Sequence, residues 1–190
     1  GQWAEEIRKD FIFEIHSFEP NKTAYNELVE KKIQNIKVFN FGLGSKNELK
    51  KLNNWTFENS MNSFLKLSDF GQKHLDVNNS LIDEVTVEIK TLDSLYKTNS
   101  LNKNILLKID VQGFELEVLK GSKELLPKIS IVEIEAPILN LYEGSTNITE
   151  LILFLESQDF IISSISTERF YNFSASDSDL LFIRKDLLNK

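Results

Sequence analysis

The hydrophobic positions of this chain fall into short dense runs separated by polar segments, and this pattern predicts strands. The run at residues 11–18 is rich in β-branched and aromatic side chains, which is typical of a strand buried in a parallel sheet. Residues 85–89 alternate apolar with polar side chains, which indicates a strand with one exposed face. The predicted strands are residues 11–18, 37–41, 85–89, 105–110, 129–135, 160–166 and 180–184.

Helical periodicity occupies several of the intervals between these strands. Asn21 or Thr23 caps the first predicted helix, which runs to about Lys32 with its apolar residues on one face. The other predicted helices are residues 92–97, 114–126 and 149–157. Residues 45–80 are rich in Asn, Ser and Lys, and we expect them to be mostly irregular, with one helical turn at residues 64–70.

The alternation of strands and helices predicts an α/β fold. We expect three layers, with helices on both faces of an open, mostly parallel sheet. Ligands of such sheets bind beyond the carboxyl ends of the strands. The residues that end the predicted strands are therefore the candidates for function, and they are Glu19, Gly42 to Gly44, Asp110, Glu133 and Glu135.

Length and charge limit the classes of function. A chain of 190 residues with 41% hydrophobic content fits one domain over residues 1–190. A formal net charge of -7 argues against a nucleic-acid partner, because phosphate binding needs a positive surface. The sequence has no cysteine and no apolar segment of membrane-spanning length. We expect a cytoplasmic protein with no membrane partner.

Asp110 ends an apolar strand and Gly113 follows it, directly before a helical pattern. One interpretation is a functional carboxylate that a sharp glycine turn presents at the edge of the sheet. The other is a plain helix cap, with Asp110 accepting hydrogen bonds from the first turn of the helix. Glu133 and Glu135 share one face of their strand, opposite Val132, so at least one should face a cleft or pair with a lysine.

Five segments together resemble the FkbM-type methyltransferases. They are "FEPN" at 18–21, "VFNFGLGSKN" at 38–47, "KTLDSL" at 90–95, "LLKIDVQGFELEVLKG" at 106–121 and "IVEIE" at 131–135. The resemblance covers roughly residues 1–166 and implies a Rossmann-like, class I methyltransferase fold with an antiparallel C-terminal strand. It also implies S-adenosylmethionine as the cofactor and an O-methyltransferase reaction.

The resemblance assigns roles to individual residues. Glu19 would hold the ribose hydroxyls of S-adenosylmethionine, and Gly42 and Leu43 would approach its adenine. Asp110 would face the sulfonium and the acceptor hydroxyl, as general base or as the group that orients it. Glu135 would help to orient the acceptor. No metal ligand is assigned, since two carboxylates do not make a metal site.

Gly1 matches the last glycine of the family's glycine-rich cofactor loop. On that alignment, the central strand and most of the loop precede the given sequence, and we expect the chain to be a fragment. The resemblance places Ser60, Asn62 and Ser63 in a variable, Ser-rich segment, where they are candidates for contact with cofactor or acceptor.

The acceptor expected from the resemblance is a hydroxyl of a sugar, a glycan or a small metabolite. One alternative is a non-catalytic, methyltransferase-like module that serves as a scaffold or binding domain in a larger glycan-modifying protein. Another is a nucleotide-dependent oxidoreductase, which the Gly42-Leu43-Gly44 turn suggests.

Overall fold

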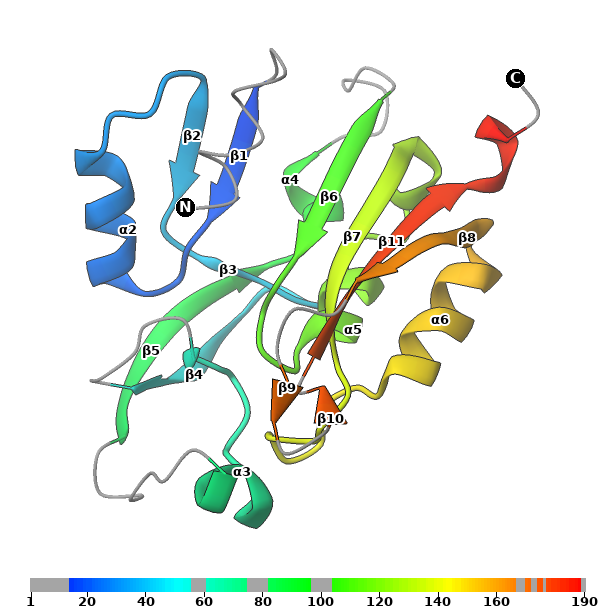
Figure 1. Ribbon diagram of the computed structural model, residues 1–190. Helices are drawn as coiled ribbons and strands as arrows, with labels where there is room; N and C mark the ends of the chain where they lie inside the picture. Colours follow the sequence, from blue (N-terminus) through cyan, green and yellow to red (C-terminus); the bar gives the residue numbers. More distant parts are fainter. Residues whose placement is uncertain are drawn as a thin grey trace.

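The structure is a computed structural model, and it describes most but not all of the chain. The described residues are 14–55, 61–74, 82–96, 104–166, 170–171, 174–175 and 177–188. Gly1, Ser60 and the first part of the strand expected at residues 11–18 lie outside them. The described residues form an α/β fold, as the sequence predicts (Figure 1).

Helices and strands alternate in the middle of the chain, whereas the strands at residues 36–55 and at residues 160–184 have no helix among the described residues between them (Figure 1). The strands are β1 Ile15–Phe18, β2 Ile36–Phe39, β3 Gly42–Leu43, β4 Glu48–Trp55, β5 Ile82–Lys90, β6 Ile105–Ile109, β7 Ile129–Pro137, β8 Phe160–Ser166, β9 Phe170–Tyr171, β10 Ser174–Ala175 and β11 Asp177–Arg184. The helices are α2 Lys22–Glu30, α3 Asp69–His74, α4 Leu92–Leu95, α5 Glu115–Lys120 and α6 Ile148–Ser157, with 3-10 turns at Leu126–Lys128 and Lys185–Leu187.

The strands form mixed sheets, so the single, mostly parallel sheet expected from the sequence is not confirmed. One sheet has the order β6-β7-β11-β8, in which β6 and β7 are parallel and β11 is antiparallel to both of its neighbours. Another has the order β3-β5-β4, with one parallel and one antiparallel pair. β1 and β2 form a separate parallel pair. The antiparallel strand near the C-terminus is present, as β11.

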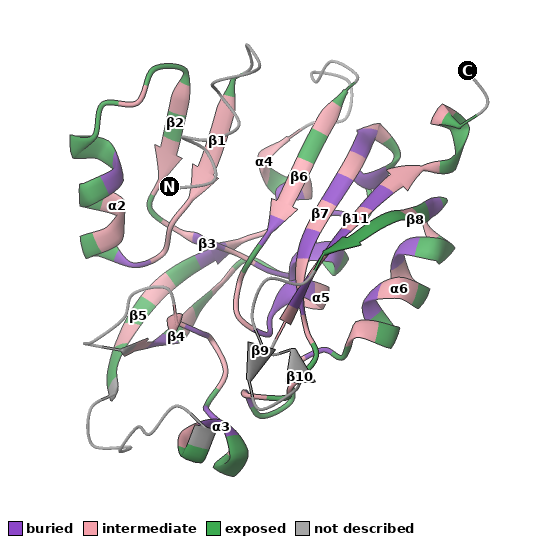
Figure 2. Ribbon diagram, in the orientation of Figure 1, coloured by how far each residue is buried: buried purple, intermediate pink, exposed green. Residues whose placement is uncertain are grey.

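The main core lies between the four-stranded sheet and the helices packed on one of its faces. Alternate residues of β7, including Val132, Ile134 and Ala136, are fully buried, while the residues between them are partly exposed (Figure 2). Leu151 and Leu155 of α6 pack into the same cluster. A capping box at Asn147 and Glu150 starts α6 by satisfying its first backbone amides.

The parallel strands present their carboxyl ends at a common edge. β1, β2 and β6 point the same way in Figure 1, and β7 runs parallel to β6. Glu19 directly follows β1, and Asp110 directly follows β6. This is the edge at which open α/β sheets bind ligands.

The expectation that residues 45–80 are mostly irregular is wrong for residues 48–55, which form a strand. The strand β4 pairs along its whole length with β5, from Glu48 opposite Ile89 to Trp55 opposite Ile82. The buried residues of β4 do not alternate with exposed ones in the usual way. Its main buried residues are the adjacent Leu52 and Asn53, while Leu49 is exposed. Backbone pairing therefore holds β4, and no apolar periodicity marks it in the sequence.

Two helix predictions need correction as well. The helix expected over residues 114–126 ends at Lys120, because the chain turns at Gly121 and continues as turns to Lys128. The helical turn expected at residues 64–70 occurs slightly later, as α3. Asn21 caps α2, which confirms one of the two caps considered, since its side chain accepts from the amides of Thr23 and Ala24.

None of the helices in the described residues is long and apolar enough to cross a bilayer.

Candidate functional site

The turn between β6 and α5 presents Asp110 at the carboxyl edge of the sheet. Gln112 and Gly113 both have positive φ, +53° and +96°. This backbone turns the chain sharply from the strand into the helix, and glycine adopts it without strain. The residue at the N-cap of α5 is Phe114, which makes no capping hydrogen bond with its side chain. Asp110 is therefore not the cap of α5, and the helix-cap interpretation is wrong.

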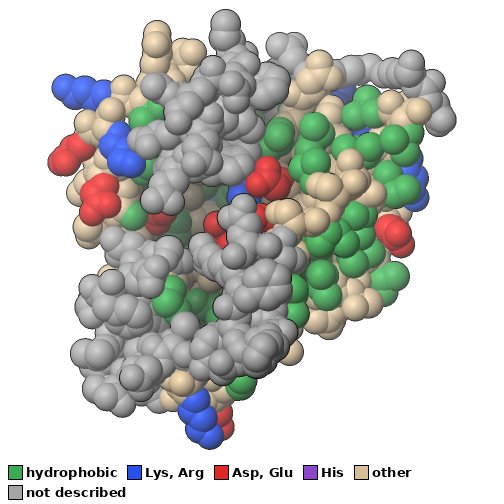
Figure 3. Space-filling model, viewed as in Figure 1, with side chains coloured by type: hydrophobic (Ala, Val, Ile, Leu, Met, Phe, Trp, Pro, Cys, Tyr) green, Lys and Arg blue, Asp and Glu red, His purple; other side chains and the backbone are tan. Residues whose placement is uncertain are grey.

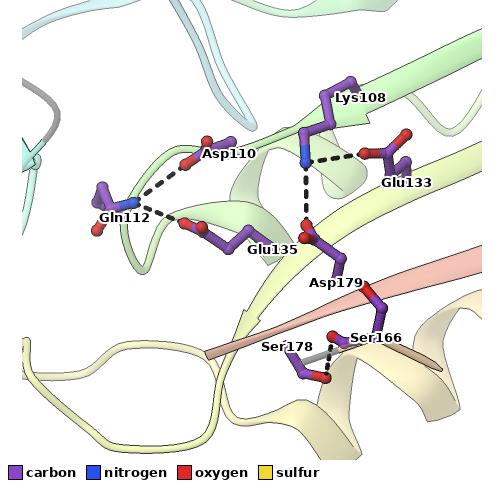
Figure 4. Close-up of polar contacts among 8 residues, drawn as sticks. All are labelled: Lys108, Asp110, Gln112, Glu133, Glu135, Ser166, Ser178 and Asp179. Carbon is purple, nitrogen blue, oxygen red and sulfur yellow. Dashed lines mark hydrogen bonds and ion pairs between the residues drawn. The ribbon is translucent and has the colours of Figure 1, made fainter. Parts of the chain in front are cut away.

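Gln112 joins the two carboxylates that the sequence proposed as catalytic. Its Nε2 donates to Oδ1 of Asp110 at 3.0 Å and to Oε2 of Glu135 at 2.8 Å (Figure 4). Asp110 comes from the end of β6 and Glu135 from the neighbouring strand β7. In the space-filling view, acidic side chains lie near the middle of the face, where β6 and β7 run in Figure 1 (Figure 3). The structure thus brings both residues into one site.

Glu133, two residues before Glu135, has a different partner. Nζ of Lys108 contacts Oε1 of Glu133 at 3.0 Å and Oδ1 of Asp179 at 3.1 Å, across three neighbouring strands (Figure 4). Burial acts to lower the pKa of Lys108, but the hydrogen bonds and charges of Glu133 and Asp179 outweigh it and raise that pKa. The expectation that one of the two glutamates pairs with a lysine is confirmed, and that glutamate is Glu133.

Glu115 is a buried carboxyl group beneath the Asp110 turn. Its Oε1 accepts the backbone amide of Gly113 at 2.8 Å, while its Oε2 has no hydrogen-bond partner among the described residues. Burial raises the pKa of Glu115 to about 7; hydrogen bonds from the backbone partly oppose the shift, and the charge of Asp110 adds to it. The carboxyl group thus holds the turn from inside the protein and takes up a proton near neutral pH.

The raised pKa of Glu115 predicts how the free energy of unfolding depends on pH. Because its pKa is raised from 4.5 to about 7 in the folded state, the folded chain keeps this proton over a range in which the unfolded chain loses it. This contribution to stability is fully present below pH 4.5 and is lost as the pH rises through about 7. The corresponding cost at pH 8 is about 3 kcal/mol.

The variant Glu115→Gln cannot titrate, so its free energy of unfolding should lose this pH dependence. Urea unfolding at pH 5 and pH 8 measures the difference, and any pH-independent cost of the buried amide cancels in the comparison. Equal pH dependence in the two proteins would show that Glu115 does not titrate in this range.

Glu19 lies at the end of β1 in a partly buried position. Its Oε1 accepts the backbone amide of Asn21 at 2.7 Å, and Asn40 donates to its carbonyl oxygen at 3.0 Å. Burial raises the pKa of Glu19, and the hydrogen bond from Asn21 opposes this shift. Asn21 also donates to Oδ1 of Asn54 in β4 at 2.7 Å. The carboxylate is thus fixed in direction at the same edge of the fold as Asp110.

Gly42 and Leu43 form the short strand β3, which pairs with β5. A Cβ on Gly42 would lie 2.9 Å from Cδ1 of Ile89 and 2.9 Å from the ring of Phe64. A Cβ on Gly44 would lie 2.8 Å from Cγ2 of Ile89. Leu43 packs against the main core. Close packing against Ile89 thus gives both glycines a structural reason, besides the ligand-binding turn that the sequence suggested.

Two site residues were missed in the sequence. Gln112 lies inside the motif "KIDVQGFE", but nothing in its sequence position tells which carboxylates its amide reaches. Tyr142 lies in a loop and is buried, with its hydroxyl donating to the carbonyl of Met61 at 3.0 Å. Ser63, which the sequence did propose, donates to the carbonyl of Gln112 at 2.7 Å.

Within the described ranges no group of three or more His, Cys, Asp or Glu side chains has the arrangement of a metal site. The side chains at this edge are carboxylates, which suit a cationic ligand. Asp110 and Glu135 are two carboxylates held together by a neutral amide, and Glu19 offers a third carboxylate for hydroxyl groups. These residues therefore fit the sulfonium and the ribose of S-adenosylmethionine.

Open α/β sheets bind ligands beyond the carboxyl ends of their parallel strands, and Asp110 and Glu135 lie together at such an edge. Comparison with known families makes this more specific. The Methyltransferase FkbM domain matches residues 3–162, and the chain belongs to the FkbM methyltransferase family. No curated protein matches the chain. The family expected from the sequence is confirmed.

Proposed function

We propose that the protein is an S-adenosylmethionine-dependent O-methyltransferase that acts on a hydroxyl group of a sugar, a glycan or a small metabolite. The observation that carries the proposal is the pair of carboxylates, Asp110 and Glu135, held at the carboxyl edge of β6 and β7. Membership of the FkbM methyltransferase family supports the reaction class.

The bound cofactor would supply a methyl group on an electrophilic sulfonium. The protein's task is then to align the acceptor oxygen and to remove its proton. We assign proton removal to Asp110, which ends β6 and does not cap α5. Glu135 orients the acceptor from the neighbouring strand, and Glu19 binds the ribose hydroxyls at the end of β1.

Partner and location follow from the same proposal. We propose a small-molecule or glycan acceptor, no nucleic-acid partner and no membrane partner, because the net charge of -7 disfavours anionic surfaces. We also propose a cytoplasmic location. The alternative of a non-catalytic scaffold module predicts no cofactor binding, and the experiment below distinguishes the two.

The test is calorimetric titration of S-adenosylhomocysteine into the full-length gene product that contains these 190 residues. We expect binding, and we expect Glu19→Ala to weaken it about tenfold to hundredfold, because charge-assisted hydrogen bonds are lost. Glu30→Ala, on the exposed surface of α2, is the matched control and should bind like the wild type. Absence of binding by the wild type would favour the scaffold, and equal binding by Glu19→Ala would remove Glu19 from the site.

A further inference from the structure

We propose that Ser63 is a positioning residue that fixes the direction of Asp110. Its buried hydroxyl group acts on the peptide plane between Gln112 and Gly113, to whose carbonyl oxygen it donates at 2.7 Å. The inference rests on the proposed function, since the direction of Asp110 matters for catalysis only if Asp110 removes the acceptor's proton. It adds a residue and a role that the family match does not assign.

The peptide plane between Gln112 and Gly113 is held from both sides. Oγ of Ser63 donates to its carbonyl oxygen, and Oε1 of Glu115 accepts its N–H at 2.8 Å. The carbonyl and the N–H of a trans peptide point in opposite directions, so Ser63 and Glu115 lie on opposite sides of the turn. The grip is directional, because turning the plane over would set the carbonyl oxygen of Gln112 against Oε1 of Glu115.

The plane needs these partners because the backbone on both sides of it is unusual. Gln112 has a φ of +53° and Gly113 a φ of +96°. Such a conformation is uncommon for a residue other than glycine and persists where the surrounding structure holds it. Nε2 of Gln112 also donates to Oδ1 of Asp110 at 3.0 Å (Figure 4). A change in this plane would therefore move both the backbone next to Asp110 and the side chain that holds its carboxylate.

Ser63 is itself anchored to β4 through Asn53. The backbone N–H of Asn53 donates to the carbonyl of Ser63 at 2.9 Å, and the N–H of Ser63 donates back at 3.3 Å. The buried side-chain amide of Asn53 donates to the carbonyls of Ser63 and Leu65, at 3.2 and 2.7 Å. The opposite orientation of this amide would set its oxygen against two carbonyl oxygens. The chain of contacts thus runs from β4 to the turn that presents Asp110.

The hydroxyl group of Ser63 is occupied by these contacts. Its one O–H is donated to Gln112, and its oxygen accepts the backbone amide of Leu65 at 3.0 Å. The residue is only 1% exposed. This geometry supports an action through the turn, in place of the direct contact with cofactor or acceptor for which the resemblance made Ser63 a candidate.

The first part of the test examines the geometry in the full-length protein without ligand. Isotope labels on the carbonyl carbon of glutamine and on the nitrogen of glycine select Gln-Gly peptides in NMR spectra, and residues 112–113 are such a peptide. Loss of the signal in Gln112→Asn assigns it. We expect Ser63→Ala to move the carbonyl signal, because the carbonyl loses its hydrogen-bond donor. An unmoved signal would overturn the proposal.

Ser145→Ala is the matched control for the loss of a hydroxyl group beside this turn. The Cβ of Ser145 would lie 3.1 Å from a Cβ added to Gly113, so the residue borders the same turn. Its buried Oγ has no hydrogen-bond partner among the described residues. The substitution therefore removes the same atom without breaking a described hydrogen bond, and it should leave the carbonyl signal in place.

The second part measures catalysis. Methyl transfer is followed with whichever compound, from a panel of sugars and small hydroxyl compounds, the wild type methylates. The rate is expressed per binding site for S-adenosylhomocysteine, counted by calorimetric titration. We expect Ser63→Ala to lower kcat per site about tenfold to hundredfold, because a slightly misplaced base loses its alignment with the acceptor. The affinity for S-adenosylhomocysteine should change by less than about threefold, and Ser145→Ala should keep both values.

The outcomes separate this inference from the proposed function. A merely structural role would lower the number of binding sites and leave the rate per site unchanged, and that result would overturn the positioning role. If the wild type methylates an acceptor but the carbonyl signal does not move in Ser63→Ala, the methyltransferase proposal stands and the inference about Ser63 is overturned. If the signal moves but the wild type binds no S-adenosylhomocysteine and methylates nothing, the hydrogen bond is real and the methyltransferase proposal fails, together with the catalytic role of Ser63.

Discussion

The variant Asp110→Asn should lose methyl transfer by about 100-fold or more, because a general base contributes roughly this factor or above it. Asparagine has nearly the same shape, and its amide oxygen can still accept the hydrogen bond from Gln112 that is 3.0 Å long in the wild type. The substitution therefore removes the proton acceptor and leaves the turn in place. Binding of S-adenosylhomocysteine should change by less than about tenfold.

The measurement is transfer of an isotope-labelled methyl group from S-adenosylmethionine to a panel of sugars and small hydroxyl compounds. Asp159→Asn is the matched control, since Asp159 is exposed beside β8 and its positive φ of +64° suits asparagine. Full activity in Asp110→Asn, with lost activity in Glu135→Gln, would show that Glu135 and not Asp110 removes the proton. Full activity in both variants would remove the pair from the reaction.

Much of this site could be predicted because it depends on strand ends and strand alternation. The apolar run before Asp110 and the following Gly113 indicated a strand, a sharp turn and a carboxylate at the edge of the sheet. Alternation along β7 placed Glu133 and Glu135 together, opposite buried Val132 and Ile134. These are properties of local sequence, and the structure confirms the placements.

The partners of these residues could not be predicted, because they depend on pairing between distant segments. Asp179 reaches Lys108 only because β11 lies beside β7, with Asp179 opposite Glu135. The strand β4 exists because β5, which begins only at Ile82, pairs with it. The hydrogen bond from Gln112 to Glu135 likewise depends on where β7 lies. Such contacts are set by the register of the sheets, which single-sequence periodicity does not contain.

The end of α5 at Lys120 is a further case in which a distant segment decides local structure. Gly121 has an ordinary φ of -82°, so it is not required for a left-handed backbone. A Cβ at this position would lie 1.9 Å from the carbonyl oxygen of Gly44 and 3.3 Å from Cα of Ser45. The glycine is thus required because the turn after β3 passes directly against the end of α5.

Gly121→Ala should accordingly lower the free energy of unfolding by about 3 kcal/mol, since the obstacle is backbone and cannot rotate away. Urea unfolding measures this loss. Gly144→Ala is the control, because Gly144 has a φ of +69° and nothing lies within 4 Å of its added Cβ. It should cost only about 1–2 kcal/mol, through backbone strain.

A cost at Gly121 no larger than at Gly144 would show that the two segments separate easily. The expected, larger cost has a consequence for the site. Relief of the clash must move either the end of α5 or the segment of Gly44, which follows directly on β3, the strand proposed to approach the adenine. Gly121→Ala should then also weaken binding of S-adenosylhomocysteine, although Gly121 touches none of the proposed ligand-binding side chains.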